Sequence, residues 1–282
     1  MMQDGKALQA GTSHYLGTGF AEAAGIRYQD KEGQQALCHT TSWGVSTRLI
    51  GGVIMTHGDD DGLRVPPAIA PHQVVILPML REDDGDEALL AYCEDLRNAL
   101  AAQTALREPI RVLLDKRAGK ATQKRWGWVK KGVPLVLEIG GRDAAGAQVS
   151  VLRRDRLYRE DGKVNFVGQA LADFTGSAAA ELEDIQRSLL AEATLRRDAN
   201  IVRGVVDMAG LEAHFAESNR YPGWVELGWS RPTGAALDGV VQKLKSLKLT
   251  LRNTPMDAAP VSGTCPFTGE PAVERIYVAR AY

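Results

Sequence analysis

The chain has few cysteines and no long apolar run. Its 282 residues include 3 Cys, namely Cys38, Cys93 and Cys265, which are too few and too scattered for a disulfide framework. No segment approaches the roughly 20 apolar residues of a membrane-spanning helix, and residues 1–10 lack the apolar core of a signal peptide. These absences argue against a membrane protein and a disulfide-rich secreted protein, so we expect a cytoplasmic location.

Histidine is scarce as well. None of the 5 His stands at the His–His or His–Glu spacing of a metal site. We expect His39 to be a hydrogen-bonded structural residue, and His57, which precedes Gly58, is typical of the end of a helix. The histidines therefore predict no metal centre.

Charge is balanced overall but unevenly distributed. The net charge is -1, yet residues 1–90 hold 6 Lys or Arg against 12 Asp or Glu, whereas residues 111–156 hold 12 against 4. A basic segment beside an acidic one suits a protein that binds RNA phosphate on one face. Ordinary solvated lysine and arginine side chains are the alternative.

Ser46, Thr47 and Arg48 lie between a strand expected over residues 34–43 and a buried helix expected over residues 49–55. At a helix start, free backbone N–H groups and a guanidinium together favour an anion such as a nucleotide phosphate. The alternative is an ion pair between Arg48 and Asp59 or Asp60.

The middle of the chain alternates strands and helices, which predicts a partly parallel sheet wrapped by helices. Gly140 and Gly141 indicate a turn rather than a phosphate-binding loop. The expected strands are 73–77, 110–114, 133–139 and 148–152, with a helix at 86–102. Further on we expect helices at 177–197, 211–217 and 239–249 and a strand after the turn at 221–223.

Several segments, in order along the chain, resemble prolyl-tRNA synthetase, a class II aminoacyl-tRNA synthetase, in its archaeal and eukaryotic-like type. The segment 43–51 is similar to the third signature motif of that class. The other similar segments are Gln9 to Phe20, Pro66 to Ile76, Lys131 to Pro134 and Val278 to Tyr282. The chain is therefore identified as resembling the C-terminal portion of this family.

The resemblance implies a multidomain fold of α/β and α+β parts. Residues 1–70 would be the C-terminal remnant of the antiparallel-sheet catalytic domain, residues 71–168 an α/β anticodon-binding domain with a mixed sheet, and residues 169–282 an α+β C-terminal domain.

The resemblance also implies a set of ligands. ATP with Mg²⁺ would bind at one group of residues and proline at another, and tRNA-Pro would bind the second domain. No side-chain nucleophile or base is implied, because the proline carboxylate itself attacks the α-phosphate. The expected residues are Gln9, Thr12, Ser46 and Arg48 for ATP, and His14 and Trp43 for proline.

The segment expected to read the anticodon departs from the family, because residues 121–128 lack its glutamates. Cationic and aromatic side chains can still contact splayed RNA bases. The candidates are Arg117, Lys124, Arg125 and Arg153. We expect at least one of Trp126 and Trp128 to lie in the core instead.

Many relatives carry four cysteines that bind zinc in the last domain. Here Cys265 resembles one of the final pair, Thr268 replaces the other, and no Cys lies between Cys93 and Cys265. Since a closed zinc site needs four N or S ligands, we expect no zinc. Cys93 lies on an apolar helix stripe and is expected in the core.

The implied function is proline–tRNA ligase, an enzyme that is a homodimer in the full-length family. The first two class II motifs are not found before Gln9, so we expect the chain alone to be catalytically incomplete, whether it is an engineered fragment, an internal start or part of a split gene. A non-catalytic tRNA-binding module or remnant is the alternative. Tyr282 could reach His14 or Arg48, as the tail does in relatives; a frayed terminus is the other possibility.

Overall fold

The computed structural model describes residues 1–80, 86–216, 222–255 and 261–280. The chain forms two compact units, one of residues Val53–Ala199 and one that combines Met1–Gly52 with Asn200–Tyr282. Within the described residues, no helix is both long and apolar enough to cross a membrane.

The Val53–Ala199 unit is built on a five-stranded mixed sheet with the order β11-β10-β9-β5-β8. Strand β5 runs parallel to both β8 and β9, whereas β10 is antiparallel to β9 and β11. The elements are η1 (Pro67–Ile69), β5 (Val74–Pro78), α3 (Asp86–Ala101), β6 (Thr104–Ala105), β7 (Glu108–Pro109), β8 (Val112–Leu114), α4 (Ala121–Lys130), β9 (Leu135–Ile139), α5 (Gly141–Ala145), β10 (Gln148–Arg153), η2 (Arg154–Arg156), β11 (Phe166–Ala170) and α6 (Leu171–Ala199).

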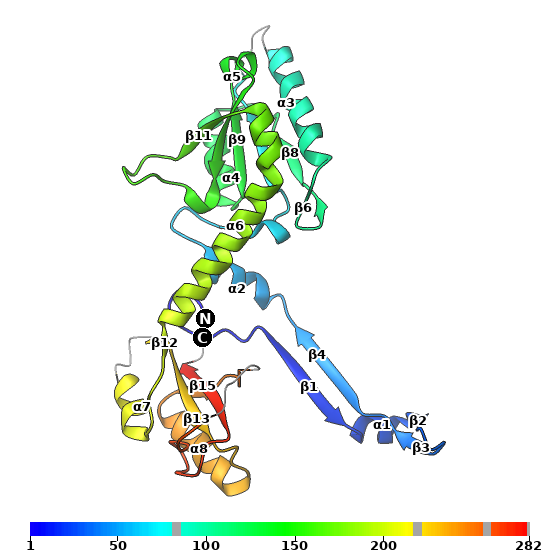
Figure 1. Cartoon of the computed structure of the whole chain (residues 1–282), viewed down its shortest axis with the longest axis vertical. Coiled ribbons are helices and arrows are strands. Elements are labelled where there is room, and N and C mark those ends of the chain that lie inside the picture. The colour runs from blue at the N-terminus through cyan, green and yellow to red at the C-terminus, as the bar shows by residue number, and fades with distance from the viewer. Residues whose placement is uncertain (81–85, 217–221, 256–260, 281–282) are drawn as a thin grey trace. The chain divides into compact units, whose positions relative to one another are not determined.

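Helices cover both faces of this sheet (Figure 1). Every residue of β5 and of β9 is buried, as expected for central strands sandwiched between helices. Val74 and Ile76 face α3 and α6, whereas Val75 and Leu77 face α4, because successive strand side chains point to opposite faces.

Helix α6 begins at Leu171 and packs Phe174, Leu182 and Leu189 into the core of this sheet. It is longer than the expected helix at 177–197. The contacts therefore group it with the sheet of the Val53–Ala199 unit, although the expected C-terminal domain starts at residue 169. The division into three domains stays a prediction.

The Asn200–Tyr282 part of the other unit contains a four-stranded sheet with the order β12-β13-β15-β14. Inward residues of β13 and β15, such as Val225 and Val278, pack with α7 and α8 into one core. The expected helix end at Glu217 lies outside the described residues. The elements are β12 (Ile201–Val202), α7 (Met208–His214), β13 (Trp224–Trp229), α8 (Gly234–Ser246), β14 (Leu249–Leu251) and β15 (Glu274–Arg280).

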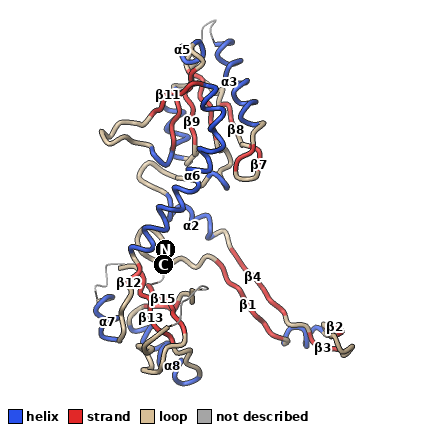
Figure 2. Tube along the Cα trace, in the orientation of Figure 1, coloured by secondary structure: helices blue, strands red, loops and turns tan. Residues whose placement is uncertain are grey.

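The Met1–Gly52 part is dominated by a ribbon of two antiparallel strands, β1 and β4, which run side by side in Figures 1 and 2. Among the described residues, none in β1, β4 or α2 is buried. Helix α2 forms where it was expected, but the expectation that it is buried is wrong. The elements are β1 (Gly11–Gly17), α1 (Gly19–Ala24), β2 (Arg27–Gln29), β3 (Gln35–Leu37), β4 (Thr40–Val45) and α2 (Arg48–His57), whose last residues belong to the other unit.

Most expected elements are confirmed, and the mixed multidomain α/β class is confirmed with them. The expected strand 34–43 is interrupted at Cys38 and His39 and forms β3 and β4. The expected turn at Gly140 and Gly141 is wrong in part, because helix α5 begins at Gly141. The Asp143 carboxylate accepts the Gly140 N–H at 2.8 Å, which stabilises the first turn of that helix.

Candidate functional site

One cavity of about 290 Å³ lies along the β1–β4 ribbon and the start of α2, and we call it the ribbon cavity. The ribbon register pairs Thr12 with Gly44 and His14 with Ser42. Because residues two apart along a strand share a face, Thr12 and His14 point to the same side. The lining residues are Gln9, Ala10, Gly11, Thr12, His14, Ser42, Gly44, Val45, Ser46 and Arg48.

Hydrogen bonds connect four of these residues. The Arg48 guanidinium donates to Gln9 Oε1 at 3.5 Å, and Gln9 Nε2 donates to Thr12 Oγ1 at 3.0 Å. Ser46 Oγ accepts the Arg48 backbone N–H at 3.3 Å, so this hydroxyl stabilises the start of α2. The structure therefore brings Gln9, Thr12, His14, Ser46 and Arg48 together around one opening.

Trp43 does not line this cavity. It pairs with Ser13 in the ribbon, so it lies on the opposite face from His14, and 77% of its surface is exposed. The position of Trp43 gives no support to a shared proline site with His14. Asp59, the alternative partner considered for Arg48, binds the buried guanidinium of Arg154.

A second cavity, of about 250 Å³, lies beside α4 in the sheet unit, and we call it the cationic cavity. Two predicted anticodon residues, Arg117 and Lys124, line it. The full set is Arg117, Ala118, Gly119, Lys120, Gln123, Lys124, Gly127, Trp128 and Lys131. Three lysines and Arg117, which is also ion-paired with Asp115, line one small opening, and this excess of positive charge favours a polyanion such as an RNA backbone.

Asp115 organises the wall of the cationic cavity from within. Its buried carboxylate accepts hydrogen bonds from Arg117 Nε at 2.8 Å and from Trp128 Nε1 at 2.8 Å. The hydrogen bond from Arg117 has the largest effect on the pKa of Asp115 and lowers it. Burial opposes this effect, but the hydrogen bond from Trp128 adds to it, so the pKa of Asp115 lies well below its usual value. Asp115 therefore stays ionised and fixes both side chains.

Trp128 has no open ring face for a base. Its surface is 7% exposed, and Lys131 Nζ and Arg117 Cζ lie 4.3 Å and 5.4 Å from its ring centroid. The expectation that at least one of Trp126 and Trp128 lies in the core is confirmed by Trp128. The cavity therefore offers a ligand charge rather than an open aromatic surface for stacking.

The other two predicted anticodon residues are occupied elsewhere. Arg125 donates to both Glu138 carboxylate oxygens, at 3.0 and 3.1 Å. Arg153 is bound by Asp155 and Asp184. Neither lines the cationic cavity, and their ion pairs satisfy the charge that an RNA contact would use.

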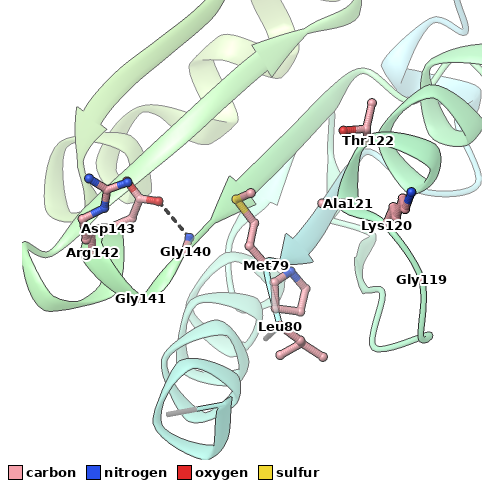
Figure 3. A pocket seen from close by; sticks show the side chains of 11 residues that line it. Met79, Leu80, Gly119, Lys120, Ala121, Thr122, Gly140, Gly141, Arg142 and Asp143 are labelled. Carbon is pink, nitrogen blue, oxygen red and sulfur yellow. Dashed lines mark hydrogen bonds between the residues drawn. The ribbon is translucent and has the colours of Figure 1, made fainter. Parts of the chain in front are cut away.

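Lys120 and Lys131 were not among the expected site residues, yet both line the cationic cavity. Lys120 also lines a third cavity, of about 560 Å³, between the end of β5 and the starts of α4 and α5 (Figure 3). The available signal was the density of lysine and arginine over residues 116–131. This density does not show which cations line a cavity and which bind a carboxylate, as Lys116 binds Glu94.

Cys265 is fully buried in the core of the C-terminal sheet. Nearby, the hydroxyls of Ser230 and Thr268 lie 2.9 Å apart within hydrogen-bonding distance. In the part of the chain that the structure describes, no three His, Cys, Asp or Glu side chains could together hold a metal ion. Cys93 is also fully buried, which confirms its core position, and burial raises its pKa to about 12.

Comparison with known proteins agrees with the sequence resemblance. Residues 73–173 match the family model of an anticodon-binding domain. Proteins named proline–tRNA ligase are 73% identical in Novosphingobium aromaticivorans, 66% in Sphingopyxis alaskensis and 43% in Paramagnetospirillum magneticum. Each match covers 100% of this chain but 55%, 53% and 54% of the relative, respectively. The chain thus spans about half the length of the curated relatives it matches.

Proposed function

We propose that this chain, as a C-terminal portion of a member of the prolyl-tRNA synthetase family, binds the anticodon region of tRNA-Pro and supplies part of the ATP and proline site. The complete enzyme would activate proline with ATP and transfer it to tRNA-Pro in the cytoplasm.

The observation that carries the proposal is the cationic cavity within the anticodon-binding domain. Arg117, Lys120, Lys124 and Lys131 surround it, and residues 73–173 match that domain. Cations positioned this way bind phosphates with an affinity that falls steeply with salt. Lys124 Nζ also donates to the Arg117 carbonyl at 3.1 Å, so Lys120 is the cleaner residue to test.

For the ribbon cavity we propose an adenylate-forming role. Arg48 would neutralise phosphate charge, Ser46 would hold the start of α2, and His14 would line the proline side. The Gln9 amide oxygen and the Thr12 hydroxyl suit Mg²⁺ and phosphate oxygens. The proline carboxylate attacks the α-phosphate and pyrophosphate leaves, so these residues act by positioning and charge neutralisation.

A non-catalytic tRNA-binding module is the second candidate. It is favoured by the lining of the ribbon cavity, where Arg48 is the single Lys or Arg among the lining residues. One guanidinium is little charge for a triphosphate, and the remaining charge would come from the part of the relatives that this chain does not span.

tRNA binding by the purified 282-residue chain tests the first part. Fluorescence anisotropy with a labelled tRNA-Pro transcript, between low and moderate salt, should give a log affinity that falls linearly with log salt. Lys120→Ala should reduce that slope by about 1. Lys163→Ala, which removes a 73% exposed lysine outside the cavity, is the matched control and should leave the slope unchanged.

No binding at low salt would reject the tRNA-binding function. Proline-dependent ATP–pyrophosphate exchange then separates the two candidates. We expect little or none from the chain alone, and exchange restored by adding the missing portion of a close relative would support the enzyme over the non-catalytic module. Exchange at a normal synthetase rate by the chain alone would contradict its expected incompleteness.

A further inference from the structure

The four-stranded sheet of the Asn200–Tyr282 part has a second face, opposite its core. Val225 and Val278 pack into the core, so Trp224, Glu226 and Tyr277, which alternate with them along β13 and β15, point to the other side. The Trp224 and Tyr277 ring centroids lie 5.7 Å apart, as expected for two side chains on one face. We call this side the outer face of the C-terminal sheet.

Arg252 lies beside Tyr277 on this outer face. Its N–H donates to the Tyr277 carbonyl at 2.9 Å, and Tyr277 N–H donates to the Asn253 carbonyl at 3.1 Å. Two residues that follow β14 thus lie opposite one residue of β15, which is the pattern of a β-bulge. Because Leu251, the last residue of β14, packs against the core, the side chain of Arg252 points to the outer face.

Two nitrogens of the Arg252 guanidinium are buried without a hydrogen-bond partner. They are Nε and Nη2, which lie along one edge of the guanidinium plane. Among the arginines that the structure describes, Arg252 alone has two such nitrogens. Burial lowers the pKa of Arg252, which is the direction expected for a cation whose desolvation no carboxylate offsets. The free edge of Arg252 is therefore suited to an anion.

Three other arginines show what this edge of a guanidinium binds in the same molecule. In each of them Nε and Nη2 donate to the two oxygens of one carboxylate, at 2.6 to 3.1 Å. This is the fork geometry that arginine offers to carboxylates and phosphates. The pairs are Arg117 with Asp115, Arg153 with Asp155, and Arg231 with Glu274.

The nearest row of the outer face carries a carboxylate, but other arginines bind it. Glu226 pairs with Tyr277 across the sheet, and it is bound by Arg203 at 3.4 Å and by Arg275 at 3.2 Å. With Arg252, three guanidinium groups thus accompany this one carboxylate. Trp224 Nε1 is a further buried donor without a partner on the same face. The excess of positive charge and of free donors favours an anion from outside the chain.

We propose that Arg252 binds an oxyanion at the outer face of the C-terminal sheet, namely the phosphate or carboxylate group of a small ligand. Arg252 Nε–H and Nη2–H donate to two of its oxygens, in the manner of Arg231 and Glu274, and the Trp224 indole N–H supplies a further donor. Arg252 lines neither the ribbon cavity nor the cationic cavity. The site goes beyond the proposed function and does not depend on it.

Thermal unfolding of the 282-residue chain in increasing phosphate, at constant ionic strength, tests the site. A ligand that binds only the folded protein raises the melting temperature with the logarithm of its concentration. Each tenfold increase above the dissociation constant should raise the melting temperature by about 5 °C. A second series with acetate in place of phosphate shows which of the two groups binds more tightly.

Arg252→Met keeps an unbranched apolar side chain but removes the guanidinium, so it should lose this rise. Without oxyanions it should be at least as stable as the unmodified chain, because it no longer buries an uncompensated cation. Arg231→Met is the matched control, since Glu274 already occupies the same edge of Arg231, and its melting temperature should rise like that of the unmodified chain. Phosphate bound at the cationic cavity affects all three proteins alike, so the difference belongs to Arg252.

NMR spectroscopy of the unmodified chain, labelled with ¹⁵N-arginine, keeps the proposal testable if Arg252→Met does not fold. The Nε–H signal of Arg252, assigned as the one missing from Arg252→Lys, should shift with phosphate until the site is saturated. Two results would overturn the site: equal rises in melting temperature for the unmodified chain and Arg252→Met, or an Arg252 signal that neither anion shifts. Neither result bears on tRNA binding, which is tested at the cationic cavity.

Discussion

The β1–β4 ribbon and the five-stranded sheet each carry a candidate site, but they support their polar side chains differently. In the sheet unit, Asp115 is buried and is bound by Arg117 and Trp128. At the ribbon cavity, Arg48 and Gln9 are both exposed, and the Arg48 guanidinium donates to Gln9 Oε1 at 3.5 Å. A buried network fixes the geometry of a site, whereas exposed contacts leave side chains free to move.

This difference follows from packing. Strands β5 and β9 are sandwiched between helices, whereas among the described residues none in β1, β4 or α2 is buried. Ordering a side chain costs conformational entropy that burial must offset. The wall of the cationic cavity is therefore held by buried contacts, whereas the side chains around the ribbon cavity are held by exposed ones.

The largest expected difference is between a core residue of the sheet unit and an exposed residue of helix α2. Leu137, which is fully buried, should cost about 2–5 kcal/mol of unfolding free energy on change to Ala, because a cavity is left. Ile50, which is 65% exposed, should change it by less than about 0.5 kcal/mol on the same substitution. Urea unfolding followed by circular dichroism measures both, and equal losses would contradict the comparison.

The polar contacts of arginine side chains should differ in the same way. Glu138→Ala removes the partner of Arg125, and their side chains are 11% and 16% exposed. Leaving that guanidinium unpaired should cost about 3 kcal/mol. Gln9→Ala removes the exposed contact to Arg48 and should cost less than about 0.5 kcal/mol. If Glu138→Ala lowers the free energy of unfolding only slightly in the same assay, the Arg125–Glu138 pair contributes little to stability.

The pH dependence tests Asp115 directly. Its pKa is lowered in the folded state, chiefly by the Arg117 hydrogen bond. A carboxyl with a lowered folded pKa contributes stability that is present above its unfolded pKa of about 3.9 and is lost as pH falls towards the folded value. The melting temperature of Asp115→Asn should therefore fall less than that of the unmodified chain between about pH 4 and pH 2. If the melting temperatures of the two proteins fall equally with pH, other carboxylates cause the loss of stability in acid.

The smallest expected effect concerns metal. A chelator should leave the melting temperature unchanged, because Cys265 and Thr268 provide one thiol where a closed zinc site needs four N or S ligands. Elemental analysis of the purified chain is the companion measurement. One zinc per chain, or a lower melting temperature with chelator, would contradict this prediction.

Much of the fold could be predicted from the sequence. The apolar run of β5 and the amphipathic stripe of α3, with Cys93 on it, depend on local periodicity and were located within a few residues. Helix α5 was not predicted, because a Gly-Gly pair usually indicates a turn. In the structure the Asp143 carboxylate accepts a hydrogen bond from Gly140 N–H, which stabilises the start of a helix there. Tyr282, which was expected to reach His14 or Arg48, lies outside the described residues.

The candidate site was predicted unevenly. Gln9, Thr12, His14, Ser46 and Arg48 line one cavity, because two paired strands and the start of the following helix bring them together. The family resemblance placed Trp43 with His14 at the proline site, but strand alternation directs Trp43 to the other face of the ribbon. The assignment of ligands to these residues stays a prediction.

By itself the sequence determined the family resemblance, the positions of most helices and strands, and the concentration of cations over residues 111–156. Only the tertiary structure decided which cations are available. Arg125 and Arg153 pair with Glu138 and Asp184, whereas Lys120 lines two cavities. Ion-pair partners and cavities form between segments that meet only when the sheet is packed, so local sequence patterns do not specify them.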